Sequence, residues 1–418
     1  MRAATRRLLA VGFATAIATS CSSEPSDPSG PPAKLDALPR ALTSGEQAVR
    51  NASNDFSFAW WNRLNEVQPG ANVFVSPLSA SFALGMTMNG ASGQTLEEMR
   101  SALQFGQTPL DEINEGYRSL ISLLVGLDPA VTTSIANSIW YRNDFSFHQT
   151  FFDTVTRYFD AEVKGLDFTN PTASLAAING WVNSNTNGRI PTILDAIPSN
   201  AVMYLINAIY FNGQWREKFD AAKTTTDIFH RGGGGTDQVR LMHRTGKMAY
   251  AENAGWQAVD LPYGNTAFTM TVVLPSESSD VESLAASLTS SSWNTLTAAL
   301  TEREVQLSLP KLRFSYERTL NDDLKALGMV IPFVGDAADF TRMSPAGNQL
   351  YISNVKQKSF VDVHEEGTEA AAATSVEIGV TSAPIIPIVR VDRPYIFVLR
   401  ERLSGTILFM GKVTRMPE

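Results

Sequence analysis

The sequence has one cysteine and four histidines among 418 residues, and its 34 Lys and Arg are outnumbered by 42 Asp and Glu. A single cysteine cannot form an internal disulfide, so a disulfide-built scaffold is excluded. The net charge of −8 argues against nucleic-acid binding, because proteins that bind phosphate backbones usually carry a basic excess. The 44% hydrophobic content is typical of a soluble globular protein with a substantial core.

Motifs for catalysis are also absent. The four histidines are far apart in the sequence, at His148, His230, His243 and His364. None has the second histidine of a zinc-protease helix, so no metal site is predicted. Residues 90–93 have the wrong spacing for the nucleophile elbow of a hydrolase, and the glycine-rich stretch 232–235 lacks the Gly-Lys-Ser/Thr of a phosphate loop. We expect neither an enzyme nor a cofactor.

The N-terminus carries an export signal. Arg2, Arg6 and Arg7 precede an apolar stretch over residues 8–18, and the first acidic residue is Glu24. This order is typical of a secretory signal peptide, which we assign to residues 1–20. The apolar stretch is too short to span a membrane, which takes about 20 residues.

The lone cysteine, Cys21, directly follows Ala18-Thr19-Ser20, which resembles the lipobox where bacterial signal peptidase cleaves and the cysteine receives a lipid. The alternative is an ordinary cleavage site followed by a chance cysteine. Residues 22–34 are rich in Ser, Pro and Gly and cannot form a core. We therefore predict a flexible linker over residues 21–43 and a folded domain over residues 44–418. The protein is expected to be exported, lipid-anchored in the cell envelope or extracellular, and otherwise not in the membrane.

Helix signals dominate the first third of this domain, and strand signals dominate the rest. Ser76-Pro77 begins a predicted helix that ends at Asn89-Gly90, and residues 95–98 match a capping box for the next helix. Strand-like runs cover residues 204–211, 267–274, 304–309 and 351–363, and residues 395–399 and 406–410 read as a buried hairpin. Helices followed by strands predict an α+β fold.

A strand, a reversal and a second strand are predicted before the C-terminal hairpin. Residues 355–366 alternate: Val355, Gln357, Ser359, Val361 and Val363 share one face, and mostly charged side chains lie on the other. Gly367 then permits a sharp reversal. Residues 368–378 also alternate, and Thr368, Ala370 and Ala372 begin a face of small side chains. The alternative is an exposed helix, because alanine beside glutamate favours helices over strands.

The chain contains, in this order, the stretches NVFVSPLSASFALGMTMNGASGQTLEEM, AINGWVNSNTNGRIPTIL, LINAIYFNGQW, VQLSLPKL, EEGTEAAAAT, RPYIFVL and LFMGKV. With these stretches the chain resembles a serpin over nearly all of residues 44–418. The resemblance implies one domain of about nine helices and three β-sheets, with an exposed reactive-centre loop that a serine protease attacks. The cut loop then inserts as a strand into the central sheet and traps the attached protease.

The resemblance also implies site residues. Counting from Gly367 places the scissile bond at Thr381-Ser382, with one residue either way as the alternative. The implied hinge consists of Glu366, Gly367, Thr368, Glu369, Ala370, Ala371, Ala372, Ala373 and Thr374. The shutter beneath the central sheet corresponds to Ser76, Ser79, Asn207 and Gln357, and the breach, where insertion begins, to Trp215, Lys311 and Glu365. Ordinary structural roles are the alternative for shutter and breach. The family often has histidine at the position of Gln357, and an amide keeps the hydrogen bonds without pH sensitivity.

The same resemblance suggests the partners. No Lys or Arg lies between residues 368 and 389, which favours an elastase-like or subtilisin-like serine protease over a trypsin-like one. The counterpart of the family's heparin-binding helix, residues 108–120, has three acids and one arginine, so no polyanion cofactor is expected. We predict a monomeric, metastable protease inhibitor. The alternative is a non-inhibitory serpin that acts as a binding or structural protein, although the small hinge side chains favour inhibition.

Overall fold

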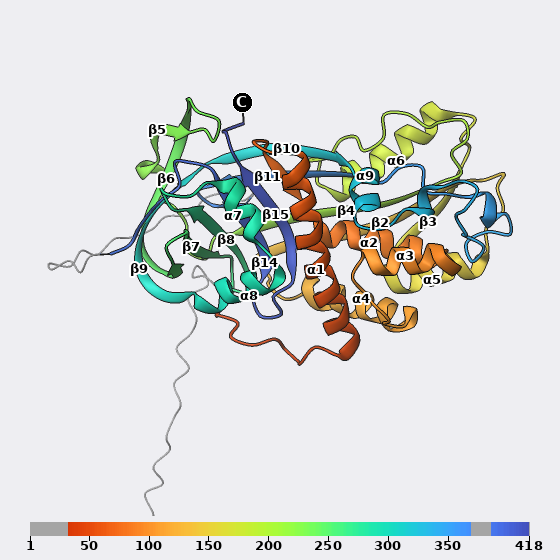
Figure 1. The fold of residues 1–418 in the computed structure, drawn as a ribbon, viewed down its shortest axis with the longest axis horizontal. Helices are drawn as coiled ribbons and strands as arrows, with labels where there is room; N and C mark the ends of the chain where they lie inside the picture. The colour runs from red at the N-terminus through yellow and green to blue at the C-terminus, as the bar shows by residue number, and fades with distance from the viewer. Residues whose placement is uncertain (1–31, 369–385, 418) are drawn as a thin grey trace, which may run out of the picture. The chain divides into compact units, whose positions relative to one another are not determined.

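A computed structural model describes residues 32–368 and 386–417 (Figure 1). Cys21, residues 369–374 of the predicted hinge and the predicted reactive bond Thr381-Ser382 lie outside the described residues. The helices of the described part are α1 (Ser44–Val67), α2 (Pro77–Met88), α3 (Gly93–Ala102), α4 (Leu110–Val125), α5 (Gln149–Phe159), α6 (Pro171–Asn185), α7 (Val281–Ser287), α8 (Ser290–Ala299) and α9 (Asn321–Ala326). None of these helices is long and apolar enough to cross a membrane.

The strands of the described residues form two hydrogen-bonded sheets. In spatial order the six-stranded sheet consists of β10 (Leu312–Thr319), β11 (Lys356–His364), β12 (Gly367–Thr368), β4 (Met203–Gln214), β2 (Val131–Arg142) and β3 (Ala161–Leu166). The nine-stranded sheet consists of β1 (Val73–Val75), β15 (Ile407–Val413), β14 (Tyr395–Glu401), β8 (Phe268–Pro275), β7 (Trp256–Pro262), β6 (Thr236–Glu252), β9 (Thr301–Pro310) and β13 (Ile388–Arg390), with β5 (Thr225–His230) paired to β6.

This architecture confirms the predicted α+β class and single domain. The resemblance implied three sheets, whereas hydrogen bonding connects the described strands into two. The reason is the 17-residue strand β6, which pairs with β9 along one part and with β7 near its end. Because β6 pairs with both strands, the part of the sheet that contains β9 and the part that contains β7 form one continuous sheet.

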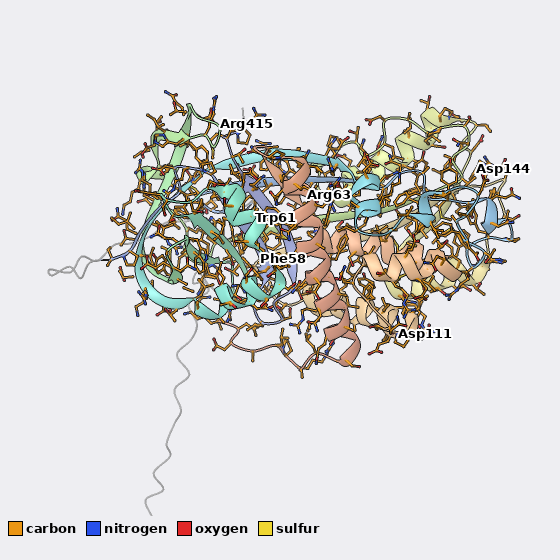
Figure 2. All side chains as sticks on the ribbon, viewed as in Figure 1. Phe58, Trp61, Arg63, Asp111, Asp144 and Arg415 are labelled. Atoms are coloured by element: carbon orange, nitrogen blue, oxygen red, sulfur yellow. The ribbon has the colours of Figure 1, made fainter. Side chains whose placement is uncertain are left out.

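The core lies where α1 and α2 meet the sheets. The predicted C-terminal hairpin is confirmed, since every residue of β14 and β15 is buried. Phe74 of β1 stacks on Phe397 and Phe409 of this hairpin, with ring centroids 5.6 and 5.2 Å apart. On α1, Phe58 and Trp61 point toward α7 and α8 (Figure 2). Such aromatic packing dominates core stability.

Helix α2 is confirmed at both predicted ends. The Ser76 hydroxyl accepts a hydrogen bond from the Ser79 N–H, Pro77 occupies the first turn, and Asn89 is the C-cap. Every residue of α2 except Ala83 is buried, because the helix contacts both β4 and β15. The start of α2 is thereby fixed beneath the six-stranded sheet.

The capping box predicted for α3 is wrong. The helix begins at Gly93, and the Thr95 hydroxyl accepts a hydrogen bond from the Asp339 N–H at 2.8 Å. The Glu98 carboxylate accepts from the N–H groups of Val330 and Ile331. Both side chains therefore bind a distant segment of the chain, and this tertiary contact replaces the local cap.

The strand predicted over residues 351–363 is shorter than expected, because β11 begins only at Lys356. Its neighbour β10 ends at Thr319, which pairs with Lys356, and the chain then turns into α9. Residues 351–355 consequently have no strand beside them. The alternation predicted for the remainder is confirmed, since Gln357, Ser359, Val361 and Val363 are the buried residues of β11.

The predicted linker extends too far into the folded part. Residues 32–43 belong to the same compact unit as the domain. The Leu35 N–H donates to the Asn265 carbonyl at 2.7 Å, and Arg402 and Arg216 donate to the carbonyls of Leu35 and Pro32, each at 2.8 Å. The linker composition ends at residue 34, and the leucines that follow pack against the core.

Candidate functional site

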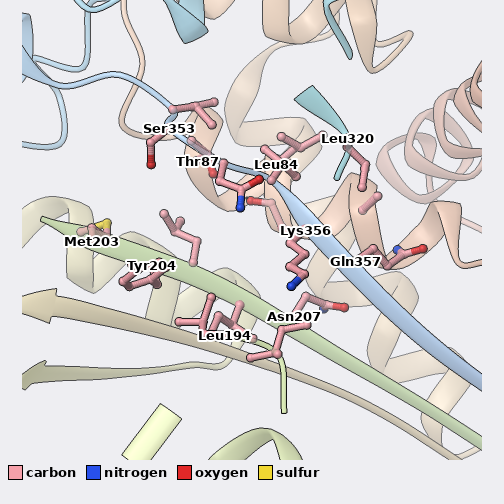
Figure 3. A pocket seen from close by; sticks show the side chains of 18 of the residues that line it. Leu84, Thr87, Leu194, Met203, Tyr204, Asn207, Leu320, Ser353, Lys356 and Gln357 are labelled. Carbon is pink, nitrogen blue, oxygen red and sulfur yellow. The ribbon is translucent and has the colours of Figure 1, made fainter. Parts of the chain in front are cut away.

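The six-stranded sheet contains a gap between β4 and β11 (Figure 3). Within the described residues no ladder joins these two strands directly; only the two-residue strand β12 lies between them. It is antiparallel to both neighbours, with Thr368 opposite Val363 of β11 and Gly213 of β4. Because β4 has twelve residues and β11 nine, most of their facing edges have no strand partner among residues 32–368 and 386–417. Such edges are templates for adding a strand.

Two glycines allow β12 to enter this gap. A Cβ atom on Gly367 would lie 2.1 Å from the carbonyl oxygen of Gly213, and one on Gly213 would lie 2.7 Å from the Tyr263 ring. The sequence assigned the chain reversal to Gly367, whereas Glu365 and Glu366 form the turn between β11 and β12. Gly367 is needed because two backbones approach closely there.

Thr368 is the one residue of the predicted inward-facing hinge set that the structure describes. It is buried, and its hydroxyl bonds the Tyr263 hydroxyl at 2.8 Å. Burial raises the pKa of Tyr263, so the phenol remains neutral at physiological pH. The sequence reasoning missed Tyr263, because an aromatic residue within an apolar run carries no signal of this contact.

The predicted breach residue Trp215 lies against the hinge turn. Its ring stacks on Tyr263, with centroids 4.5 Å apart. Its indole N–H donates to the His364 carbonyl at 2.9 Å, and its backbone N–H donates to the Glu366 carbonyl at 3.0 Å. Trp215 therefore binds both the last residue of β11 and the turn that follows.

The other two predicted breach residues form an ion pair. Lys311 Nζ lies 2.7 Å from Glu365 Oε2, and the Thr224 hydroxyl donates to Glu365 Oε1 at 2.9 Å. Burial raises the pKa of Glu365, but the bonds from Lys311 and Thr224 outweigh it, and the net pKa is lowered. Lys218 pairs with the neighbouring Glu366 at 2.8 Å. Both turn carboxylates thus have a basic partner.

The four predicted shutter residues gather at the start of α2 and form two hydrogen-bond networks, one to each strand, which are joined through the Ser79 N–H bond to the Ser76 hydroxyl. On β11, Gln357 accepts from the Ser76 N–H at 2.9 Å and donates to the Ser76 carbonyl at 2.7 Å. On β4, Asn207 accepts from the Ser79 hydroxyl. Among the described residues no hydrogen bond joins Gln357 to Asn207. Each strand is therefore anchored to α2 and not to the other strand.

The second network continues through a residue that the sequence reasoning missed. Asn207 donates to Asn137 of β2 at 2.7 Å, and Asn137 donates to the Phe159 carbonyl at the end of α5. Asn137 and Asn207 lie directly opposite each other in the ladder of β2 and β4. A polar side chain within an apolar strand was the available signal, since buried amides are nearly always bonded.

A cavity of about 140 Å³ continues the gap at the end away from β12. Helix α2, the first residues of β4 and residues 350–357 form its walls, including Leu84, Met203, Tyr204, Asn207 and Gln357 (Figure 3). A second hollow of about 20 Å³ lies beside Thr368. The described residues contain no group of three His, Cys, Asp or Glu side chains arranged to hold a metal. The site is an opening between the facing edges of β4 and β11, with α2 forming one of its walls.

Comparison with known proteins relates this architecture to one family. A family model described as "Serpin (serine protease inhibitor)" matches residues 51–416. Human Serpin B11 is 32% identical over 389 residues, covering 88% of this chain and 99% of the relative. Human thyroxine-binding globulin, solved with thyroxine, aligns with a TM-score of 0.82 at 29% identity, covering 90% of this chain and all of that one. Native tengpin, a thermophilic serpin, aligns with a TM-score of 0.80 at 31% identity over 92% and 97%.

Proposed function

The chain belongs to the serpin family, and from this premise we propose that it inhibits serine proteases by loop cleavage and strand insertion. The observation that supports inhibition most directly is the gap between β4 and β11, which β12 has already entered. A strand continuing from Thr368 would meet, on both sides, strand edges that have no partner in the described part of the chain. Thyroxine-binding globulin shows that serpins also bind small molecules, so a non-inhibitory function is the alternative outcome.

The chemistry is an interrupted peptide hydrolysis. The protease serine Oγ attacks the carbonyl carbon of the scissile bond, proposed as Thr381-Ser382. The C–N bond breaks, an ester forms between the loop and the serine, and the new amino group leaves with a proton. Insertion of the freed strand would then occur before water hydrolyses the ester. Strand insertion thus competes with deacylation.

The register of β12 indicates where the inserting strand would lie. Continuing the pairing from Thr368 opposite Gly213 and Val363 brings Thr374 opposite Asn207 of β4 and Gln357 of β11. Alternate residues of a strand share a face, so Thr374 would point to the same buried side as Thr368. The proposed hinge therefore spans the distance from the breach to the shutter, with small side chains along the inward face.

A denaturing gel tests the proposal. The purified protein is mixed with subtilisin and with elastase, and each protease with its active serine blocked is the control. We expect a covalent complex with at least one active protease and none with the blocked forms. Mass spectrometry of the released fragment, expected to begin at Ser382, checks the reactive bond. Cleavage without any complex would overturn inhibition and favour a binding role.

We also propose export and lipid attachment at Cys21, after removal of residues 1–20. The lipobox-like sequence before Cys21 and the Ser/Pro/Gly-rich stretch after it support this. Labelling with a radioactive fatty acid is expected to mark the wild type and not the Cys21→Ala variant. Equal labelling of both would refute the anchor. We further propose a monomer, which light scattering of the lipid-free protein tests.

A further inference from the structure

The turn between β11 and β12 is closed by a histidine side chain. His364 and Gly367 face each other in the ladder, so Glu365 and Glu366 are the two central residues of the turn. The His364 Nδ1 atom accepts a hydrogen bond from the Glu366 N–H at 3.3 Å. This is the pattern of an Asx turn, in which a side chain accepts from the amide two residues onward. A histidine can accept this bond only while Nδ1 carries no proton.

The backbone carbonyls of the same turn are held by partners that do not titrate near neutral pH. The His364 carbonyl binds the Trp215 indole, and the Glu366 carbonyl binds the Trp215 backbone N–H. The Glu365 carbonyl accepts from the Phe219 N–H at 2.9 Å. Among the contacts described for this turn, the bond to the imidazole is therefore the one that a proton removes near neutral pH.

Charges of both signs act on the imidazole. Among the described residues they include Asp362 on β11, Lys311 between β9 and β10, and Glu365 and Glu366 in the turn itself. Behind them, Arg313 lies 3.6 Å from Asp362, and Lys218 pairs with Glu366. Burial lowers the pKa of His364 and Lys311 adds to this, while the three carboxylates oppose it; the net pKa is lowered from its ordinary value near 6.5. The ring is thus mainly neutral at pH 7 and gains its proton only as the pH falls below 6.5.

We propose that His364 is a pH-sensitive cap of the hinge turn, which holds the Glu366 N–H when neutral and releases it when protonated. The release loosens the turn from which the loop departs, while the Trp215 contacts remain. A consequence for protease trapping follows only if the proposed inhibitory function holds. The cap itself is a property of the turn and is measurable without any protease.

The test measures hydrogen exchange of the Glu366 amide in full-length protein with ¹⁵N-labelled glutamate, at pH 7.5 and 5.5, relative to its intrinsic rate. We expect protection in the wild type to be lower at pH 5.5, by up to about fivefold, which is the change when one neutral hydrogen bond is lost completely. His364→Asn is the matched control, because asparagine supplies an acceptor that does not titrate. Its protection is expected to stay high at both pH values, whereas His364→Ala is expected to be low at both.

Two results would overturn the cap. One is an unchanged protection factor in wild type between the two pH values; the other is wild-type protection in His364→Ala at pH 7.5. The same samples are mixed with subtilisin and elastase in parallel. Failure to form a covalent complex there would remove the inhibitory function and leave the amide result unaffected, so the two failures are distinguishable.

Discussion

Replacing Gln357 tests whether this residue has the role of a shutter, which restrains the opening of the sheet, or the role of an ordinary buried side chain. It is 9% exposed, and its amide makes two hydrogen bonds to the backbone of Ser76. Gln357→Ala leaves both backbone groups without this partner, and each unsatisfied buried group costs about 1–3 kcal/mol. Because Gln357 also lines the cavity of the gap, water can reach the exposed groups. We therefore expect the lower value of about 1 kcal/mol for each of the two groups, and a loss of about 2 kcal/mol in the free energy of unfolding.

Ser359→Ala is the matched control for this substitution. Ser359 lies two residues further along β11 on the same buried face, and its hydroxyl donates to the Phe74 carbonyl. Its loss removes one hydrogen bond, worth about 1 kcal/mol, away from the contact between β11 and α2. Unfolding entropy of about 2 cal/mol/K per residue converts these costs to melting shifts of about 2–3 °C for Gln357→Ala and about 1 °C for Ser359→Ala.

The kinetic effect is expected to differ more than the melting temperatures. If the bonds to Ser76 hold β11 in place until a strand inserts, removing about 2 kcal/mol from that barrier speeds spontaneous insertion at least tenfold. Calorimetry measures the melting shifts. The fraction of protein that stays folded through a brief heat pulse, after incubation, measures how much of it has inserted its loop spontaneously. Equal conversion rates in Gln357→Ala and Ser359→Ala would refute a shutter role for Gln357.

Three further predictions concern the loop and the hinge end of the gap. Proteolytic cleavage of the loop is expected to raise the melting temperature measured by circular dichroism, and an unchanged value would contradict a metastable native state. Gly367→Ala is expected to expel β12, since its Cβ would lie 2.1 Å from the Gly213 carbonyl, and slower protease trapping on gels checks this. Because the pKa of Glu365 is lowered, its contribution to stability is present above its ordinary pKa and lost as pH falls through the lowered value. Glu365→Gln should therefore flatten urea-unfolding stability between pH 5 and 3; a slope like that of wild type would argue against the ion pair.

Local signals predicted the elements whose stability is decided within the element or its nearest neighbour. The proline and serine at the start of α2 and the alternation of β11 are such signals, and both were confirmed. The capping box at Thr95 and the linker to residue 43 failed for the opposite reason. In both cases the deciding partners, Asp339 and Arg402, lie more than 200 residues away, where no local pattern points to them.

The candidate site shows the same division. The resemblance supplied Ser76, Ser79, Asn207 and Gln357 as one set, and the structure brings them to one place. It did not indicate that Gln357 bonds only to α2 or that Asn207 bonds onward to Asn137. These hydrogen-bond partners depend on which side chains face each other across the gap. That in turn depends on the separation of β4 from β11, which no single stretch of sequence encodes.

The two ends of the gap are held by different chemistry, and this determines how conditions act on it. At the hinge end, Lys311, Lys218 and His364 bind groups of the turn through charge or a titratable nitrogen. At the far end, neutral hydroxyls and amides bind the start of α2, and Lys356 at the start of β11 pairs with Asp195 and Glu317. Salt screens partly exposed ion pairs but not buried neutral hydrogen bonds, and mild acid protonates imidazole but not an amide. Mild acid should therefore act on the imidazole at the entry of the gap and leave the amide contacts at its far end unchanged, whereas salt should weaken the ion pairs at both ends.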